Sequence, residues 1–221
     1  SQSATNGIAV RDLKLYGHRE NDLVRLPDPT NVLKYPHIAM TGYAQRGYVV
    51  SGSQDSIGSS VTYNTWKAFD GDTTEFWLTG TGEYPSGVYD SSVTGLYNLG
   101  TLIGGGSTDN GHYLKLELPH KLKISRVNMH ARTGYEPQAP KNFKFYGSND
   151  DTNWEQIGPS FSNEAPQDDG TSYYTLNSIK AYKFIGLVVT ETVGDGNGRL
   201  AISELKYYGT GVDSIPIQIG G

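Results

Sequence analysis

The chain of 221 residues has no cysteine, which excludes a disulfide framework, a thiolate zinc site and a cysteine nucleophile. Basic residues are few and scattered. The 18 Lys and Arg residues against 23 Asp and Glu give a net charge of −5, and without a basic run we expect no nucleic-acid partner. No apolar run approaches the roughly 18 residues that span a bilayer, so we expect no membrane insertion.

Motifs for catalysis are also missing. No H-E-x-x-H pair or G-x-S-x-G turn occurs, and Gly104–Gly106 lacks the strand and helix of a phosphate loop. The sequence therefore predicts that the chain is not an enzyme. One alternative stays open: the bond between Asp28 and Pro29 is labile in acid, which would allow a self-processing domain.

The chain is rich in residues of turns and strands, with 28 glycines and 16 tyrosines. Short apolar runs are separated by Gly, Asn, Asp and Pro, which predicts an all-β jelly-roll β-sandwich. Strands are expected at 48–53, 113–118, 124–132, 143–147, 173–176, 182–190 and 201–208. The run 182–190 is apolar on both faces and should lie centrally, a bulge is expected near 124–132, and the connections 78–112, 158–172 and 191–199 are long.

Two segments far apart in the chain resemble each other. Residues 9–17, AVRDLKLYG, match residues 201–209, AISELKYYG, at five of nine positions. We interpret 1–17 as the last strand of an upstream repeat or an edge strand, 18–47 as an extended connector, 48–209 as the β-sandwich and 210–221 as a linker to the next unit. Neighbouring repeats of the same protein are therefore expected partners.

The most informative stretch is WKAFDGDTTEFW, from Trp66 to Trp77. Its D-G-D turn concentrates acidic oxygens, and Gly71 lets the backbone curl so that carbonyl groups point inward. Calcium prefers six to eight oxygen ligands of this kind. The alternative is an ordinary Asp-Gly turn without a metal, which has the same sequence pattern.

The order of AFDGDTTEFW, HYLKLELPHKLKISRVNMHAR, FKFYGSNDDTNWEQIG, YKFIGLVVTET and ISELKYYG resembles the discoidin domains, also called F5/8 type C domains. Family 32 carbohydrate-binding modules of the galactose-binding-like type share this pattern, and the resemblance covers 48–209. It implies a jelly-roll sandwich with a structural Ca²⁺. The matching positions are the Asp70 side chain, the Lys67 and Asp72 carbonyl groups and Glu204. The family usually has Thr where this chain has Glu75, so either Glu75 or Thr74 would complete the site.

The same resemblance implies a sugar site at the loop end beside the metal. An aromatic ring suits the apolar face of a pyranose, and planar donors suit its hydroxyl groups. The candidates from composition are Trp77, Tyr84, Tyr89, His112, Arg132, Tyr135, Lys141 and Arg199. Core packing is an alternative for Trp77, loop packing for the loop tyrosines and a solvated strand end for Arg132.

Two function hypotheses follow. The first is a non-catalytic, calcium-stabilised carbohydrate-binding module that gives adhesion to a glycan or polysaccharide within a larger repetitive surface protein. The second is a structural or protein-interaction spacer without a sugar site. The segments RDLKLYG, YPHIAMTG and SIPIQIGG are similar to parts of repetitive structural proteins of algal DNA viruses, which implies an extracellular or virion-surface location.

Overall fold

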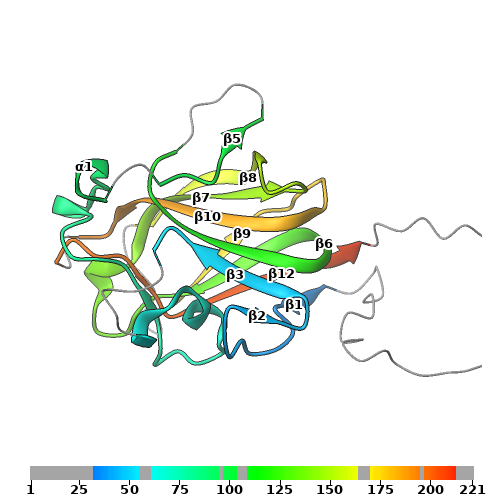
Figure 1. Ribbon diagram of the computed structural model, residues 1–221, viewed down its shortest axis with the longest axis horizontal. Helices are drawn as coiled ribbons and strands as arrows, with labels where there is room; N and C mark the ends of the chain where they lie inside the picture. The colour runs from blue at the N-terminus through cyan, green and yellow to red at the C-terminus, as the bar shows by residue number, and fades with distance from the viewer. Residues whose placement is uncertain are drawn as a thin grey trace, which may run out of the picture.

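Strand β6 (His112–His130) organises the molecule, which is shown as a computed structural model in Figure 1. The structure describes residues 32–54, 61–94, 97–103, 109–163, 170–194 and 197–212. Leu114, Leu116 and Leu118 alternate along β6 as the sequence predicted, and all three side chains are completely buried. Among the described residues, no helix has the length and apolar character needed to cross a membrane.

The other elements are short strands and single helical turns. The strands are β1 (Leu33–Tyr35), β2 (Ala44–Gln45), β3 (Tyr48–Gly52), β4 (Trp77–Leu78), β5 (Thr101–Leu102), β7 (Pro140–Ser148), β8 (Asn153–Ser162), β9 (Thr171–Thr175), β10 (Tyr182–Thr192), β11 (Ala201–Ile202) and β12 (Glu204–Val212). The helices are α1 (Ser91–Thr94) and the 3₁₀ helices Val61–Tyr63, Thr65–Phe69, Pro85–Gly87 and Glu136–Gln138.

The two halves of β6 belong to different layers of the sandwich. Its first half pairs with β3 and β10, so that Val50 and Ile185 both lie opposite Leu116. Its second half pairs with β12 and β9, so that Leu205 and Ser172 both lie opposite Met129. Strands β7, β8 and β5 extend the first layer and β1 extends the second, which confirms the all-β jelly-roll sandwich.

A bulge lies near the middle of β6, as the sequence predicted. Tyr208 of β12 lies opposite Arg126, while the next residue, Gly209, lies opposite Ile124, so Ser125 is the extra residue. Glycine is required here, because a Cβ on Gly209 would lie 2.3 Å from the carbonyl oxygen of Lys123.

Strand β10 lies centrally, between β6 and β7, as its two apolar faces predicted. Leu187 on one face is fully buried in the main core. Val188 on the other face packs with Tyr146 and Trp154, against which Leu99 also packs. The long connection 78–112 therefore covers the outer face of the sheet, and its strand β5 pairs in parallel with β8.

Three expectations about elements need correction. The predicted strands 113–118 and 124–132 form one strand, because pairing with four neighbours carries β6 across the gap. Residues 158–162, expected in a loop, continue β8 opposite β7. Part of the expected connector 18–47 is integral to the sandwich, since Lys34 pairs with Tyr208 and the Tyr35 ring is completely buried. Residues 1–31, including the repeated segment 9–17, lie outside the described residues.

The central position of β10 generates a stability prediction. Leu187→Ala should lower the free energy of unfolding by about 2–5 kcal/mol, because the side chain is fully buried and its removal leaves a cavity. Ile179→Ala, a deletion of the same size at a side chain that is 85% exposed, should change it by less than about 0.5 kcal/mol. Urea unfolding of both variants checks this, and equal losses would contradict the assignment of β10 to the core.

Candidate functional site

The D-G-D turn holds its acidic side chains with its own backbone. Asp70 Oδ1 accepts the N–H of Asp72 at 2.9 Å, and Asp72 Oδ1 accepts both the N–H and the hydroxyl of Thr74, at 2.8 and 2.7 Å. Gly71 has φ = +80°, a left-handed conformation that glycine adopts without strain. The pKa of Asp72 falls because of its hydrogen bonds to Thr74.

Lys67 places its ammonium group within the same turn. Its Nζ lies 3.1 Å from Glu75 Oε2 and 3.8 Å from Asp70 Oδ2. Glu75, at the position where the family usually has Thr, is thus engaged by an internal cation. The Lys67 side chain also lies over the Trp66 ring, 4.7 Å from its centroid.

Glu204 approaches this turn from the first position of β12. Its side chain is only 3% exposed, its Oε2 has no hydrogen-bond partner, and the N–H of Gly71 donates to its carboxylate. Burial raises the pKa of Glu204 to about 7, and the nearby charge of Asp70 adds to that effect. Burial also raises the pKa of Asp70.

The two carboxylates Asp70 and Glu204 therefore lie close together in a desolvated place, each with a raised pKa. This arrangement fits an oxygen-liganded cation, because a bound cation would compensate both charges and satisfy the unpartnered oxygen. Among the described residues, no group of three or more His, Asp and Glu side chains is arranged to hold a metal, so backbone carbonyl groups would have to complete such a site.

Three of the eight expected sugar-binding residues are buried. The side chains of Trp77, Tyr84 and His112 are all 0% exposed, because they belong to the packing between the long connection and β6. The Trp77 indole donates to the carbonyl of Gln54, and the Tyr84 hydroxyl donates to the carbonyl of Val189. These three residues offer no surface to a ligand, and we leave them out of the binding site.

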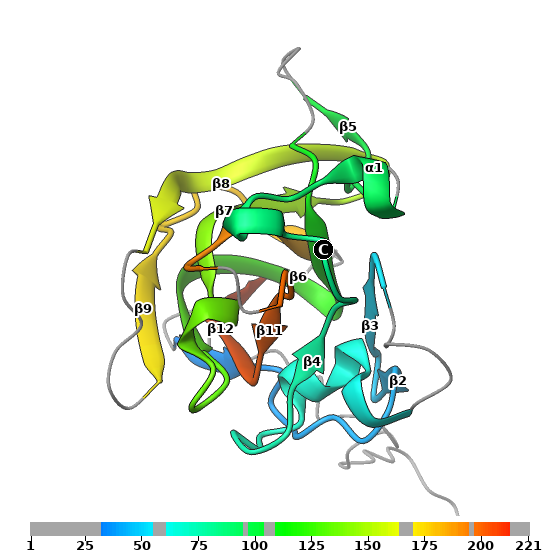
Figure 2. The same ribbon diagram turned by 90° about the vertical axis from the view of Figure 1, so that its left-hand side faces the viewer.

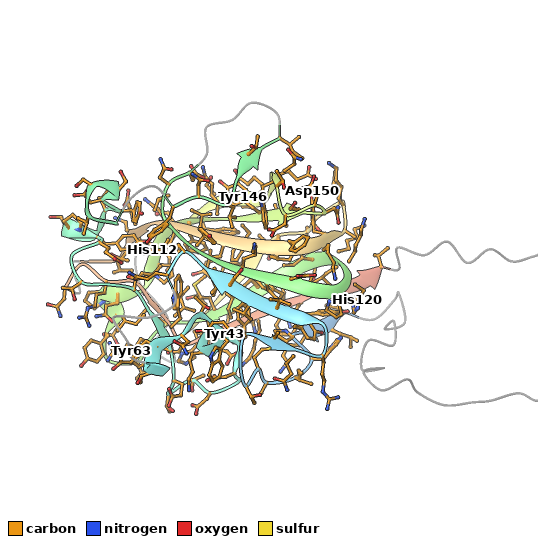
Figure 3. All side chains as sticks on the ribbon, viewed as in Figure 1. Tyr43, Tyr63, His112, His120, Tyr146 and Asp150 are labelled. Atoms are coloured by element: carbon orange, nitrogen blue, oxygen red, sulfur yellow. The ribbon has the colours of Figure 1, made fainter. Side chains whose placement is uncertain are left out.

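His112 belongs to a buried polar chain instead, and Figure 3 labels its position. Its Nε2 lies 2.7 Å from Glu83 Oε2, and its Nδ1 lies 2.8 Å from Ser53 Oγ. The Gln54 amide donates to the other Glu83 oxygen at 3.0 Å. Burial alone would raise the pKa of Glu83, but the hydrogen bond and charge of His112, with the Gln54 amide, outweigh it and lower the pKa.

The rings of Tyr84, Tyr89 and Tyr97 surround the His112 imidazole, with centroids 5.7, 5.4 and 5.1 Å away. Tyr89 is partly buried in this packing. The polar chain thus joins the segment directly after β3, the long connection and β6 inside the molecule, which is a structural role.

Two expected residues, Arg132 and Tyr135, do meet, in the loop between β6 and β7. Figure 2 faces the loop end of the sandwich, where the short strands β4 and β11 lie side by side. The Arg132 guanidinium lies 3.6 Å from the centroid of the Tyr135 ring and 4.1 Å from that of Phe76. Its Nη1 donates to Gln138 Oε1 at 3.1 Å, and the Phe76 ring stacks on Tyr63, 5.0 Å between centroids. We call these five residues the Arg132 cluster.

The Arg132 cluster has an exposed edge. The Tyr135 side chain is 47% exposed, while Tyr63, Phe76 and Arg132 are half-buried and Gln138 is buried. Lys141 and Arg199, also expected at the site, have other contacts. Lys141 Nζ lies 3.9 Å from Glu191 Oε2, and Arg199 Nε donates to the Thr81 hydroxyl at 2.9 Å.

Sequence reasoning missed Tyr63, Phe76 and Gln138. Phe76 carried a usable signal, because it directly precedes the buried Trp77 and neighbouring residues of an extended segment point to opposite sides. Tyr63 and Gln138 carried no such signal. Tyr63 lies in a turn far from Arg132 in the chain, and Gln138 lies in a turn whose conformation no sequence pattern predicts.

The family model for the F5/8 type C domain matches residues 50–205. The chain belongs to the F5/8 type C domain family. This confirms the resemblance carried by the five sequence blocks. No curated protein sequence matches this F5/8 type C domain closely enough to add to that assignment.

Solved structures show the same fold. A family 32 carbohydrate-binding module of NanJ from Clostridium perfringens, in complex with galactose, has 14% identity and a TM-score of 0.50, covering 73% of this chain and 93% of that chain. A second such module, from a family 31 glycoside hydrolase of the same species, has 14% identity and a TM-score of 0.53, covering 84% and 95%. The C-terminal domain of a chitobiase from Bacteroides fragilis has 24% identity and a TM-score of 0.52, covering 76% and 96%.

The buried pair of Glu83 and His112 generates a prediction. Glu83→Gln should lower the free energy of unfolding at pH 7 by about 3 kcal/mol, because it removes one partner of a buried pair. The folded pKa of Glu83 lies below its ordinary value of 4.5, so its contribution is present above that pH and is lost as the pH falls further. The difference between variant and wild type should therefore shrink in acid.

Thermal unfolding between pH 3 and pH 7 measures this effect. The control is Asp151→Asn, which removes a carboxylate from the more exposed pair with Lys115 and should cost less than about 1 kcal/mol. A Glu83→Gln variant as stable as Asp151→Asn at pH 7 would show that the buried pair does not stabilise the fold.

Proposed function

We propose that this F5/8 type C domain is a non-catalytic carbohydrate-binding module that holds a glycan at the Arg132 cluster. The observation that carries the proposal is the Arg132 guanidinium placed over the rings of Phe76 and Tyr135 at an exposed edge. The fold shared with modules described as binding galactose, or GalNAc-β-1,3-galactose, supports the same class of ligand.

The chemistry of the Arg132 cluster suits a pyranose. The exposed Tyr135 ring offers a flat apolar surface for the C–H groups of the sugar. The guanidinium has five N–H donors in a fixed plane, more than the single Gln138 acceptor takes, and hydroxyl groups accept such donors. Stacking against Phe76 and Tyr135 holds the guanidinium before a ligand arrives, which reduces the entropy lost on binding.

A structural calcium ion at the D-G-D turn is the second part of the proposal. Asp70 and Glu204 would supply carboxylate oxygens, the Lys67 and Asp72 carbonyl groups would add two more, and Thr74 or Glu75 would complete the set. The support is the buried, unpartnered Oε2 of Glu204 and the raised pKa of both carboxylates. The ion would join the turn to β12 and stabilise the fold by mass action.

The wider setting remains a hypothesis. Adhesion within a larger repetitive protein on a cell or virion surface would let neighbouring repeats act together, so that weak single sites give useful avidity. Residues 9–17, 28–29 and 213–221, on which the repeat and self-processing hypotheses depend, lie outside the described residues. The spacer hypothesis predicts that no glycan binds even when the domain is multimerised.

Glycan binding is tested with an array that contains galactose- and N-acetylgalactosamine-terminated glycans, followed by calorimetry on the best ligand. Arg132→Ala and Tyr135→Ala should each weaken binding roughly tenfold or more, because each removes a central contact. The control Lys180→Ala changes a side chain that is 58% exposed and paired with Glu155, away from the cluster, and should leave binding unchanged. Binding that survives both cluster variants would refute this site.

Calcium binding is tested by thermal unfolding with and without the ion. The folded pKa of Glu204 is raised from 4.5 to about 7, so the calcium-free domain should lose stability as the pH rises through that window, by on the order of 3 kcal/mol. Calcium should therefore raise the unfolding midpoint more at pH 8 than at pH 5. Magnesium should have a smaller effect, because it demands stricter octahedral geometry.

The variant Glu204→Gln distinguishes calcium binding at the D-G-D turn from other effects of calcium on stability. Without calcium at pH 8 this variant should be at least as stable as wild type, because it removes a buried charge. It should also lose the calcium response. An equal calcium shift in wild type and Glu204→Gln would exclude the proposed site.

A further inference from the structure

Positive charge is concentrated on one sheet face of this acidic protein. The strands concerned are β1, β12, β9 and the second half of β6, residues 121–130. Among the described residues of these segments, Glu204 is the only acid, whereas five side chains are basic: Lys34, Lys121, Lys123, Arg126 and Lys206. The chain as a whole has a net charge of −5, so this distribution is markedly uneven.

Strand register places these cations on one outer face. Lys206 lies opposite Asn128, which lies opposite Tyr173, and the intervening residues Leu205, Val127 and Tyr174 are buried in the core. The next row along the strands is Tyr208, Arg126 and Thr175. Successive rows on one face are separated by about 7 Å, because side chains alternate along a strand.

This face is hollowed at both ends. One hollow of about 220 Å³ is lined by Thr73, Asn128, His130, Thr171, Tyr173, Glu204, Lys206 and Tyr208, so that it adjoins the D-G-D turn through Thr73 and Glu204. The other, of about 520 Å³, is lined by residues that include Lys123, Ser125, Ile179 and Thr210. Both lie along β6, with β12 on one side and, on the other, β9 for the first hollow and the segment 177–179 after β9 for the second, and we call them together the β12–β6–β9 groove. Nine residues of β12 follow it, a length of roughly 30 Å.

The side chains of the groove are arranged for a polar, anionic chain. Arg126 lies over the Tyr208 ring, 4.3 Å from its centroid, which holds the guanidinium in place between the two hollows. Asn128 Oδ1 is buried without a hydrogen-bond partner in the first hollow. The Tyr173 ring, 65% exposed, is available as an apolar platform beside it. Hydroxyl groups of Thr171 and Thr175 lie on the same face.

The geometry points to a second binding site, in which the β12–β6–β9 groove holds an extended anionic polysaccharide, its sulfate or carboxylate groups on Arg126, Lys206 and Lys123 and a sugar ring on Tyr173. This site lies on the sheet face rather than at the Arg132 cluster, and it does not depend on the proposed function of that cluster. Charge complementarity identifies the ligand class, because the groove carries cations on a surface that is otherwise acidic overall.

A glycan fits the groove better than the other polyanions. A nucleic-acid duplex would extend beyond the groove onto the acidic remainder of the surface, where repulsion opposes binding. A bilayer is planar and would reach the exposed Lys123 and Arg126 more readily than the half-buried Asn128 and Lys206. A single polysaccharide chain is narrow enough to enter, and its hydroxyl groups match the Asn and Thr side chains.

The test compares dextran sulfate with uncharged dextran, which has the same backbone, on the full chain. Dextran sulfate should bind saturably and more weakly at higher salt, and dextran should not bind at the same concentration. The double variant Arg126→Glu and Lys206→Glu should weaken binding at least about tenfold. The matched control, Lys115→Glu and Lys183→Glu, changes the net charge equally on the other part of the sheet and should alter binding less than about twofold.

If both double variants lose dextran sulfate affinity equally, the groove site is overturned, because binding would then depend only on the net charge of the protein. Binding of duplex DNA or of anionic phosphatidylserine vesicles as tight as that of dextran sulfate, with the same sensitivity to the groove variants, would overturn the glycan assignment. Circular dichroism checks folding, and Lys34→Glu with Lys123→Glu, both at exposed positions, replaces the first variant if that one unfolds.

The variant Arg132→Ala tests whether the two sites are separate. This variant should still bind dextran sulfate. If it does not, both ligands use one site, and the proposal of a separate groove site is overturned. If no neutral glycan binds the wild-type protein while dextran sulfate does, the Arg132 cluster proposal fails and the groove proposal stands.

Discussion

The fold depends on the shared pairing of strand β6. One continuous backbone segment pairs with β3 and β10 over its first half and with β12 and β9 over its second half. Because strand pairing fixes which residues face inward, this single strand sets the register of both layers. It also places His112 in the buried packing under the long connection, and Asn128 on the outer face of the second layer.

The sandwich buries two acidic side chains, Glu83 and Glu204, in different electrostatic surroundings. Glu83 and His112 compensate each other inside the first layer, where the Gln54 amide and Ser53 hydroxyl complete the chain of contacts. Glu204 is buried to the same degree but keeps an unpartnered oxygen beside Asp70. In the first arrangement the carboxylate has an ion-pair partner, with Glu83 Oε2 2.7 Å from His112 Nε2, and the role is structural. The second is unbalanced in charge, and this imbalance is the physical basis for proposing a cation there.

The two proposed binding sites are separated in space as well. The Arg132 cluster lies at the loop end, where one guanidinium meets two aromatic rings, and suits a compact sugar. The basic face of β12, β6 and β9 lies along the strands and suits an extended chain. Both use an arginine over a tyrosine ring, since stacking orients the planar donor group at small entropic cost. A module with both sites would distinguish glycans by end group and by charge.

The sequence by itself determined the fold class, the inward leucines of β6, the central place of β10 and the turn at Gly71, because alternation, apolar runs and glycine chemistry are local properties. The family resemblance, together with the residue types at the loop end, also suggested Arg132 and Tyr135. Only the tertiary structure decided that Trp77, Tyr84 and His112 are buried, and that Phe76 and Tyr63 complete the Arg132 cluster. It alone brought Lys34, Lys206 and Arg126 onto one face, since their strands are far apart in the chain and become neighbours only because β12 pairs with β1 on one side and with β6 on the other.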